Sequence, residues 1–187
     1  PSHIIEAGIK AIREGYTHYG PTAGLPDLKA AIARNIRETR GIDIDPGRVL
    51  VTPGGKPIIF FTALALLQNG DEVMYPDPGF PIYESMIRFL GARPVPIRLR
   101  KEEGCHLDLE DLEAKISNRT KMVIINSPHN PTGSVMSRQE VANLADILKK
   151  REDIYVLSDE IYKDILYEGE HFSIASISGM ERRTIIL

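Results

Sequence analysis

Short apolar segments alternate along the chain with segments in which apolar residues recur every three or four positions. Short, nearly continuous apolar runs are typical of strands that are buried on both faces of a sheet. Such runs cover residues 49–51, 73–75, 95–97, 122–125, 154–157 and 184–187. Helical spacing covers residues 28–36, 109–116 and 141–148. This alternation predicts an α/β fold with a mostly parallel sheet and helices on both faces.

Local signals mark several element ends. Ser137, with Glu140 three positions later, has the pattern of a capping box ahead of the 141–148 helix. Asp108 is the predicted N-cap of the 109–116 helix.

Residues 57–67 are a further predicted helix, because proline suits the first helical turn and Asn69-Gly70 ends a helix. Residues 14–26 contain Gly, Pro, Tyr and His without any periodicity, so they are a predicted surface loop.

Composition narrows the class of protein. The 187 residues are 42% hydrophobic and 26% charged, and 23 basic residues stand against 26 acidic ones. No nucleic-acid partner is predicted, because such proteins usually carry a basic field. No membrane partner is predicted either, since the longest apolar stretch, residues 57–67, is too short to cross a bilayer. The single cysteine, Cys105, suits a reducing compartment and favours a cytoplasmic location, and residues 1–10 lack a signal-peptide pattern.

Unusual residues follow four of the predicted strands. Ligands of open α/β sheets bind beyond the carboxyl ends of parallel strands. The segments that follow are T-P-G-G-K-P, P-D-P-G-F-P, N-S-P-H-N-P-T-G and S-D-E-I-Y, which begin at residues 52, 76, 126 and 158. Together they offer glycines, an aromatic ring, amides, and a carboxylate beside a phenol. These groups predict a site for a planar, anionic ligand that contains nitrogen.

Gly54, Gly55 and Lys56 open a predicted helix, where free N–H groups and the helix dipole attract a phosphate. An ordinary turn before a helix is the alternative. The segment is no Walker A loop, since Pro57 follows Lys56, and no G-x-G-x-x-G fingerprint follows any strand.

Asp159 leaves a buried strand, where a carboxylate can hold a cation such as a protonated ring nitrogen, or can cap a helix. Tyr162 lies on the same side of a helical turn, with packing as its alternative. Asn130 can donate to an oxyanion or form an Asx-turn, and Asn130-Pro131 is a candidate cis bond. Phe80 can stack on a ring or belong to the core. His18, His106, His129 and Cys105 lack metal-ligand spacing, so no metal site is predicted.

Five segments, in order along nearly the whole chain, resemble motifs of the class I/II, fold-type I aminotransferases that use pyridoxal phosphate, with aspartate aminotransferase as the type. They are Y-G-P-T-A-G-L-P-D-L, V-T-P-G-G-K, P-D-P-G-F-P, N-S-P-H-N-P-T-G and V-L-S-D-E-I-Y, beginning at residues 19, 51, 76, 126 and 156.

The resemblance implies roles around the cofactor ring. Asp159 would pair with the protonated pyridine nitrogen. Tyr162 and Asn130 would hydrogen-bond the 3′ oxygen, and Phe80 would stack on the ring. By the resemblance, Asp159, Tyr162 and Asn130 would support catalysis by binding the cofactor ring and would not form a covalent bond to it. Phe80 and Asn130 would also contact the substrate.

The resemblance also implies a phosphate site and a dimer. Gly54, Gly55 and Lys56 would bind the phosphate of pyridoxal 5′-phosphate. Tyr19 would reach the phosphate bound in the partner subunit, which implies a homodimer.

One expected feature of the family is absent from the chain. The lysine that forms the Schiff base stands in an S-K motif beyond the Asp-Tyr segment, and none is present before Leu187. The chain therefore resembles a fragment, most of a large cofactor-binding domain without its C-terminal part. Residues 1–26 would be an N-terminal helix and dimer-contact loop, and residues 27–187 the sheet core. By the resemblance, a late antiparallel strand is missing between the first predicted strand, residues 49–51, and the last, residues 184–187. Its loss would leave residues 49–51 without a sheet neighbour, so we expect an exposed edge and marginal stability.

The favoured hypothesis is an enzyme that transfers an amino group between an L-amino acid and a 2-oxo acid, with the 187-residue chain inactive on its own. The alternatives are another fold-type I activity, such as a carbon–sulfur lyase, and a non-catalytic domain that binds pyridoxal phosphate. The residues that would select the substrate lie outside the five motifs.

Overall fold

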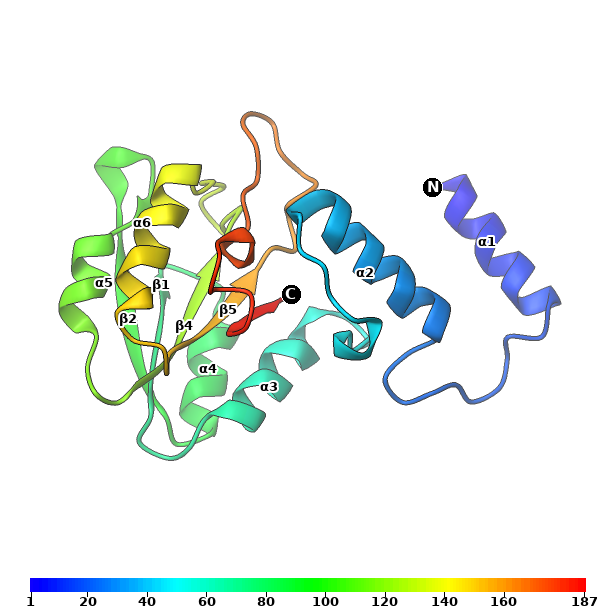
Figure 1. Cartoon of the computed structure of the whole chain (residues 1–187), viewed down its shortest axis with the longest axis horizontal. Coiled ribbons are helices and arrows are strands. Elements are labelled where there is room, and N and C mark those ends of the chain that lie inside the picture. Colours follow the sequence, from blue (N-terminus) through cyan, green and yellow to red (C-terminus); the bar gives the residue numbers. More distant parts are fainter.

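A single mixed sheet organises the molecule (Figure 1). The computed structural model describes the backbone of residues 1–187 and every side chain except that of Glu103. In this described part the sheet has six strands in the order β3-β2-β1-β4-β5-β6. Their bounds are β1 Glu72–Asp77, β2 Arg93–Arg100, β3 His106–Leu107, β4 Thr120–Asn126, β5 Tyr155–Asp159 and β6 Thr184–Ile186. Only the short β3 runs antiparallel to its neighbour, so the predicted mostly parallel sheet is confirmed.

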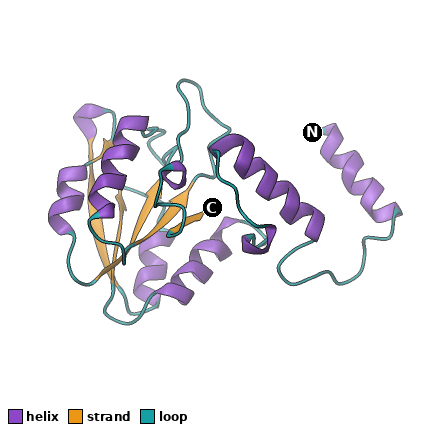
Figure 2. Cartoon of the chain, in the orientation of Figure 1, coloured by secondary structure: helices purple, strands orange, loops and turns teal.

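Helices cover both faces of the sheet, as predicted (Figure 2). On one face α5 (Leu109–Lys115) and α6 (Arg138–Lys149) pack Leu112 and Leu144 against β4 and β5. On the other face α3 (Gly55–Leu66) and α4 (Ile82–Phe89) form a second core with β1 and the opposite side of β4. Both cores are made of buried apolar side chains, which explains why the strands have continuous apolar runs.

The predicted caps are present. The Ser137 backbone N–H donates to Glu140 Oε2 at 2.7 Å, and the Glu140 N–H donates to Ser137 Oγ at 3.2 Å, which completes a capping box for α6. The Asp108 carboxylate accepts from the Asp111 N–H at 3.1 Å and caps α5. These two helix starts are therefore confirmed.

The N-terminal arm, α1 (Ser2–Arg13) and the segment 14–25, extends away from the sheet (Figure 1). None of the residues of α1 is buried, and Ile4, Ile5 and Ile12 are exposed. The predicted loop ends where α2 (Pro26–Arg40) begins, so that prediction is confirmed. A helix with an uncovered apolar face needs a further surface to pack against.

Residues 49–51 are not a strand, so that prediction is wrong. They follow the short 3₁₀ helix Pro46–Arg48 as irregular extended chain, and the Val51 N–H donates to Ala23 at 3.1 Å. The physical reason is that no described strand lies beside them to complete a ladder. Two further differences are small: α3 starts two residues before Pro57 and ends at Leu66, ahead of the Asn69-Gly70 turn.

A large groove lies beside β6, where the resemblance implies a further strand. It has a volume of about 740 Å³, and α2, α3, residues 49–50 and the chain from 184 to 187 line it. Most of its side chains are apolar, including Ile32, Ile36 and Phe61. Strand β6 pairs with β5 on one side only, so its other edge faces this groove. The predicted exposed edge is therefore present on β6.

Within the described residues, no helix combines the length and apolar character needed to cross a bilayer.

Candidate active site

A cavity of about 210 Å³ lies at the carboxyl ends of the parallel strands β4 and β5, beside the start of α3. The carboxyl ends of parallel strands meet at one edge of a sheet, which is why side chains distant in sequence converge here. The cavity is lined by Gly55, Lys56, Ile59, Phe80, Tyr83, Asn126, Asn130, Asp159, Ile161, Tyr162 and Leu187.

Most of the predicted site residues meet in this cavity. The residues brought together are Gly55, Lys56, Phe80, Asn130, Asp159 and Tyr162. Gly54 directly precedes them as the N-cap of α3. Tyr19 is the exception, since it lies fully exposed on the N-terminal arm and does not line the cavity. Because most of these residues directly follow predicted strands, the sequence predicts that they lie at one edge of the sheet.

The start of α3 lines the cavity with Gly55 and Lys56. Gly54 has φ 91°, a conformation that favours glycine, and no described side chain caps the helix. The first N–H groups of α3, at Gly55 and Lys56, therefore remain available, and the helix dipole adds partial positive charge. This helix start is suited to an anion.

The carboxylate of Asp159 also lines the cavity. This last residue of β5 is 4% exposed. Its Oδ2 accepts from the Tyr83 O–H at 2.6 Å, and its Oδ1 accepts from the Ile161 N–H at 3.3 Å. Burial raises the pKa of Asp159, and these two hydrogen bonds act against that rise. None of the described cationic side chains pairs with Asp159, so the carboxylate is suited to a cationic ligand in the cavity.

Tyr83 is a site residue that sequence reasoning missed. It lies on α4 with no exposed surface, and burial followed by the Asp159 charge raises the pKa of its phenol. Its ring stands at 89° to that of Phe80, with centroids 5.8 Å apart, and so supports the Phe80 side chain. The sequence offers no specific signal for it, because Phe80 precedes α4 and the contact with Asp159 is a tertiary one.

Asn126, also missed, ties the loop after β4 to the end of β5. Its Nδ2 donates to the Asp159 carbonyl at 3.0 Å and to the Pro128 carbonyl at 3.2 Å. Its Oδ1 accepts from the Asn130 N–H at 2.8 Å. The Asn130-Pro131 bond is cis, as suggested by the sequence. These contacts fix Asn130 beside Asp159 at the cavity.

All of this chain, residues 1–187, matches the family described as aminotransferase class I and II. The chain belongs to this family. A probable aspartate/prephenate aminotransferase of Aquifex aeolicus is 41% identical over 179 residues, which are 95% of this chain and 45% of that protein. An aspartate aminotransferase of Pyrococcus abyssi is 37% identical over 187 residues, which are 99% of this chain and 48% of that protein. The chain thus spans about half the length of these curated relatives.

Solved aminotransferases share the fold closely. The aspartate aminotransferase of Thermus thermophilus, solved with maleate, has a TM-score of 0.95 and 39% identity, over 100% of this chain and 48% of that one. The aromatic aminotransferase of Pyrococcus horikoshii has a TM-score of 0.96 and 36% identity, over 100% of this chain and 50% of that one. The sequence resemblance and the fold class are therefore confirmed. These relatives are enzymes.

Members of the class I and II aminotransferase family use pyridoxal phosphate, and the residues present fit this group. The uncapped start of α3 suits its phosphate, and the half-buried Phe80 suits its flat ring. The deciding observation is the buried Asp159 carboxylate without a cationic partner in the described chain, because a protonated pyridine nitrogen is such a partner.

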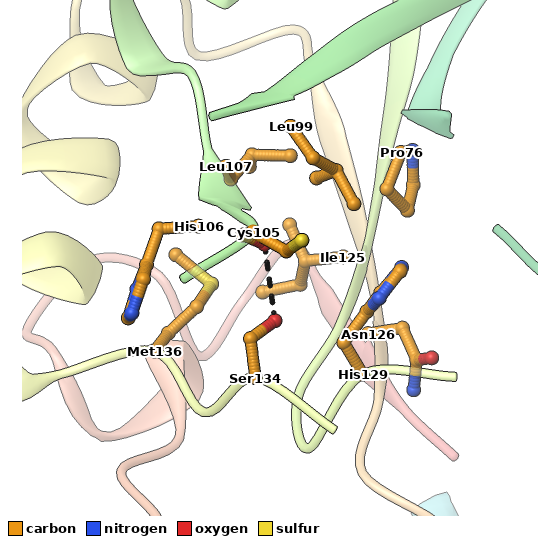
Figure 3. Close-up of a pocket in the computed structure, with 10 residues that line it drawn as sticks. All are labelled: Pro76, Leu99, Cys105, His106, Leu107, Ile125, Asn126, His129, Ser134 and Met136. Atoms are coloured by element: carbon orange, nitrogen blue, oxygen red, sulfur yellow. Dashed lines mark hydrogen bonds between the residues drawn. The ribbon is translucent and has the colours of Figure 1, made fainter. Parts of the chain in front are cut away.

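A second, smaller cavity is lined by Asn126, His129 and Ser134 together with Cys105 and His106, and it does not have the size of a ligand site (Figure 3). Its volume of about 20 Å³ has room for one water molecule. His129 Nδ1 lies 2.9 Å from Thr132 Oγ1, and burial lowers the pKa of this histidine. Ser134 Oγ donates to the Cys105 carbonyl at 3.1 Å. No group of three His, Cys, Asp or Glu side chains with metal-binding geometry occurs among the residues described.

We expect Tyr83→Phe to weaken cofactor binding first at acid pH. Burial is the largest influence on the pKa of Asp159 and raises it, whereas the Tyr83 O–H lowers it. Loss of the phenol therefore raises this pKa further, and Asp159 loses its charge at a higher pH. The acid limit of cofactor binding is the pH below which binding weakens. It should rise by about one pH unit, because a hydrogen bond to a charged group contributes roughly 1.5 kcal/mol and one pKa unit corresponds to about 1.4 kcal/mol.

The measurement is a fluorescence titration with pyridoxal phosphate at several pH values on the full-length protein that contains this chain. Tyr155→Phe, at the other end of β5, is the matched control and should leave the acid limit unchanged. An acid limit that does not move in Tyr83→Phe would contradict this role of the phenol.

Proposed function

We propose that this chain is the cofactor-binding part of a pyridoxal-phosphate-dependent aminotransferase, which transfers an amino group between an L-amino acid and a 2-oxo acid. The observation that carries the proposal is one cavity lined both by the uncapped start of α3 and by the buried Asp159, which has no cationic partner in the described chain, within a chain of the aminotransferase family. An anionic group and a cationic nitrogen on one planar ligand match these two features.

The proposed phosphate site consists of backbone N–H groups at the start of α3. Gly54 and Gly55 allow the close approach of the anion, and the exposed Lys56 adds a positive charge. The Lys56 ammonium also lies 6.0 Å from the centre of the Phe80 ring, so its side chain borders the cavity next to the proposed phosphate site. In this proposal Lys56 is not the lysine that carries the cofactor.

The proposed role of Asp159 is to hold a proton on the pyridine nitrogen. When bound, the cofactor supplies an electron-withdrawing ring that stabilises negative charge on the substrate's α-carbon. Asp159, held by Tyr83 and the Ile161 N–H, stays ionised opposite a cation and so keeps that nitrogen protonated. Tyr162 and Asn130 would donate to the 3′ oxygen. Phe80 would pack against the ring, and Phe80 and Asn130 would also border the substrate.

The lysine that carries the cofactor has no candidate in this chain and is proposed to lie in a following part of the full-length protein. Leu187 lines the cavity and directly follows β6, so the next residues of a longer chain would enter the site from there. The resemblance to the family also implies an arginine that binds the substrate carboxylate, and we assign it to the same following part. The 187-residue chain alone is accordingly proposed to be inactive.

A homodimer is part of the proposal. Residues 1–26 would form its contact arm and residues 27–187 the sheet core. Support comes from the fully exposed Tyr19 ring and from α1, which buries none of its residues against the sheet. Tyr19 would reach the phosphate bound in the partner subunit.

The proposed location of the enzyme is the cytoplasm.

The test is an amino-transfer assay of the full-length protein with ¹⁵N-labelled L-amino acids. The solved and curated relatives act, by name, on aspartate, prephenate, alanine or aromatic compounds, so the panel should contain acidic, small and aromatic amino acids. We expect the label to appear in the amino acid made from an added 2-oxo acid. A 2-oxo acid product formed without any acceptor would contradict transfer and favour a lyase instead.

A further inference from the structure

Two consecutive residues at the end of β5 and just after it are buried carboxylates. Asp159 is 4% exposed and the next residue, Glu160, is 3% exposed. Two like charges at adjacent buried positions each make ionisation of the other harder. Consistent with this, the Glu160 charge acts to raise the pKa of Asp159, after the larger effect of burial. A second negative charge therefore belongs to the residue next to Asp159, and it must be neutralised.

Arg40 neutralises Glu160. Its Nε and Nη2 donate to Glu160 Oε2 at 2.8 and 2.7 Å, and the two side chains are 5% and 1% exposed. The other carboxylate oxygen, Oε1, accepts from Ser158 Oγ at 2.9 Å and from Ser173 Oγ at 2.5 Å. Both oxygens of Glu160 are thus satisfied. A buried ion pair in which every lone pair has a donor keeps its charges, whereas the loss of one partner leaves an uncompensated charge.

The ion pair connects parts of the chain that are far apart in sequence. Arg40 is the last residue of α2, and its carbonyl accepts from Ser176 Oγ at 2.8 Å. The end of α2 is therefore attached both to residue 160 and to the 3₁₀ helix Ile174–Ser176. This attachment holds the turn that runs from Asp159 to Tyr162.

Other charged groups near Glu160 do not replace Arg40. His171 Nε2 lies 3.8 Å from Glu160 Oε2, but burial lowers the pKa of this histidine, so it is neutral at neutral pH. Lys163 pairs with Asp164 at 2.7 Å. On the Asp159 side, the facing groups are the phenols of Tyr83 on α4 and of Tyr162 in the turn. Arg40 is accordingly the cation that balances Glu160.

We propose that Arg40 is a positioning residue for Asp159: it neutralises the neighbouring Glu160 and fixes the turn that follows β5. The proposal rests on the proposed function, because it concerns the same cofactor nitrogen. It makes a prediction that a purely structural ion pair does not make. Removal of Arg40 leaves a negative charge beside Asp159, whereas removal of the Glu160 charge leaves a positive one. The two substitutions break one ion pair but shift the ionisation of Asp159 in opposite directions.

The test compares Arg40→Met, Glu160→Gln and the double variant in the full-length protein. For each we would measure the dissociation constants of pyridoxal phosphate and of its deaza analogue, in which a C–H group replaces the ring nitrogen, across acid to mildly alkaline pH. The ratio of the two constants reports the pairing of Asp159 with the nitrogen. Arg37→Met is the matched control, since Arg37 lies one turn earlier on α2 and pairs with Asp43 at the surface.

We expect the wild-type preference for pyridoxal phosphate to fall as the pH is lowered and Asp159 takes up a proton. Arg40→Met should move this fall to higher pH, by about one pH unit for a tenfold change in the proton affinity of Asp159. Glu160→Gln should move it to lower pH, the double variant should return it close to wild type, and Arg37→Met should leave it unchanged.

Shifts of Arg40→Met and Glu160→Gln in the same direction, or an equal loss of affinity for both ligands, would overturn the proposal and leave the ion pair a structural role only. If Arg40→Met does not fold, the other two variants decide. A Glu160→Gln variant that does not move the fall to lower pH, or a double variant that does not return it toward wild type, would overturn the proposal. A wild-type protein that does not distinguish the two ligands would instead contradict the proposed function itself.

Discussion

In the full-length protein, Asp159→Ala should lower the rate of amino transfer by about 10²- to 4 × 10³-fold, because breaking a buried ion pair costs roughly 3–5 kcal/mol and each 1.4 kcal/mol is a factor of ten. In the proposed site, the substitution leaves the protonated cofactor nitrogen without its carboxylate partner. The fold should be retained, since in the described chain Asp159 has no cationic partner and burial disfavours its charged form. Only the Tyr83 O–H and the Ile161 N–H lose their acceptor.

Turnover, far-ultraviolet circular dichroism and cofactor affinity would be measured together on this variant. Asp153→Ala is the control, because Asp153 pairs with Arg151 at the surface, away from the cavity. We expect Asp153→Ala to retain normal turnover. Turnover like that of the wild type in a folded Asp159→Ala protein would refute the assignment of Asp159 to the cofactor nitrogen.

The 187-residue chain produced on its own should be only marginally stable. The groove of about 740 Å³ leaves apolar side chains of α2, α3 and β6 in contact with water, and the free edge of β6 has unpaired backbone groups. The arm adds no compensating burial, since α1 has no buried residue. We expect a broad unfolding transition at low denaturant and binding of a hydrophobic dye, both absent from the full-length protein.

Differential scanning calorimetry of the chain and of the full-length protein would check this expectation. A sharp, cooperative transition of the isolated chain at high temperature would show that the groove is not a defect in its packing. The same result would remove the reason for expecting a further strand beside β6.

Elements with a strong local signal were predictable from the sequence. Strands β4 and β5 have continuous apolar runs because both of their faces are covered, and α6 begins at the predicted Ser137–Glu140 capping box. Residues 49–51 have the same apolar character, yet they form no strand because a strand also requires a neighbour. This requirement is a property of the assembled sheet and is not visible in a short segment.

Cavity residues that directly follow a strand were predictable from the sequence. Residues that reach the cavity region only through long-range tertiary contacts were not. Asp159 and Asn130 follow strands and were identified. Tyr83 resembles an ordinary core residue of a helix until its O–H is found 2.6 Å from Asp159. The Arg40–Glu160 ion pair joins residues 120 positions apart, and no periodicity or spacing connects them.

The central claim is that Asp159 and the start of α3 belong to a pyridoxal phosphate site in an aminotransferase. The most direct test is the intact mass of the protein purified from its source, after borohydride reduction and peptide mapping. The account predicts a mass well above the 20.9 kDa of this chain, with one phosphopyridoxyl group on a lysine that follows Leu187. A protein of 20.9 kDa without an adduct would contradict the account and favour a binding role without a cofactor-bearing lysine.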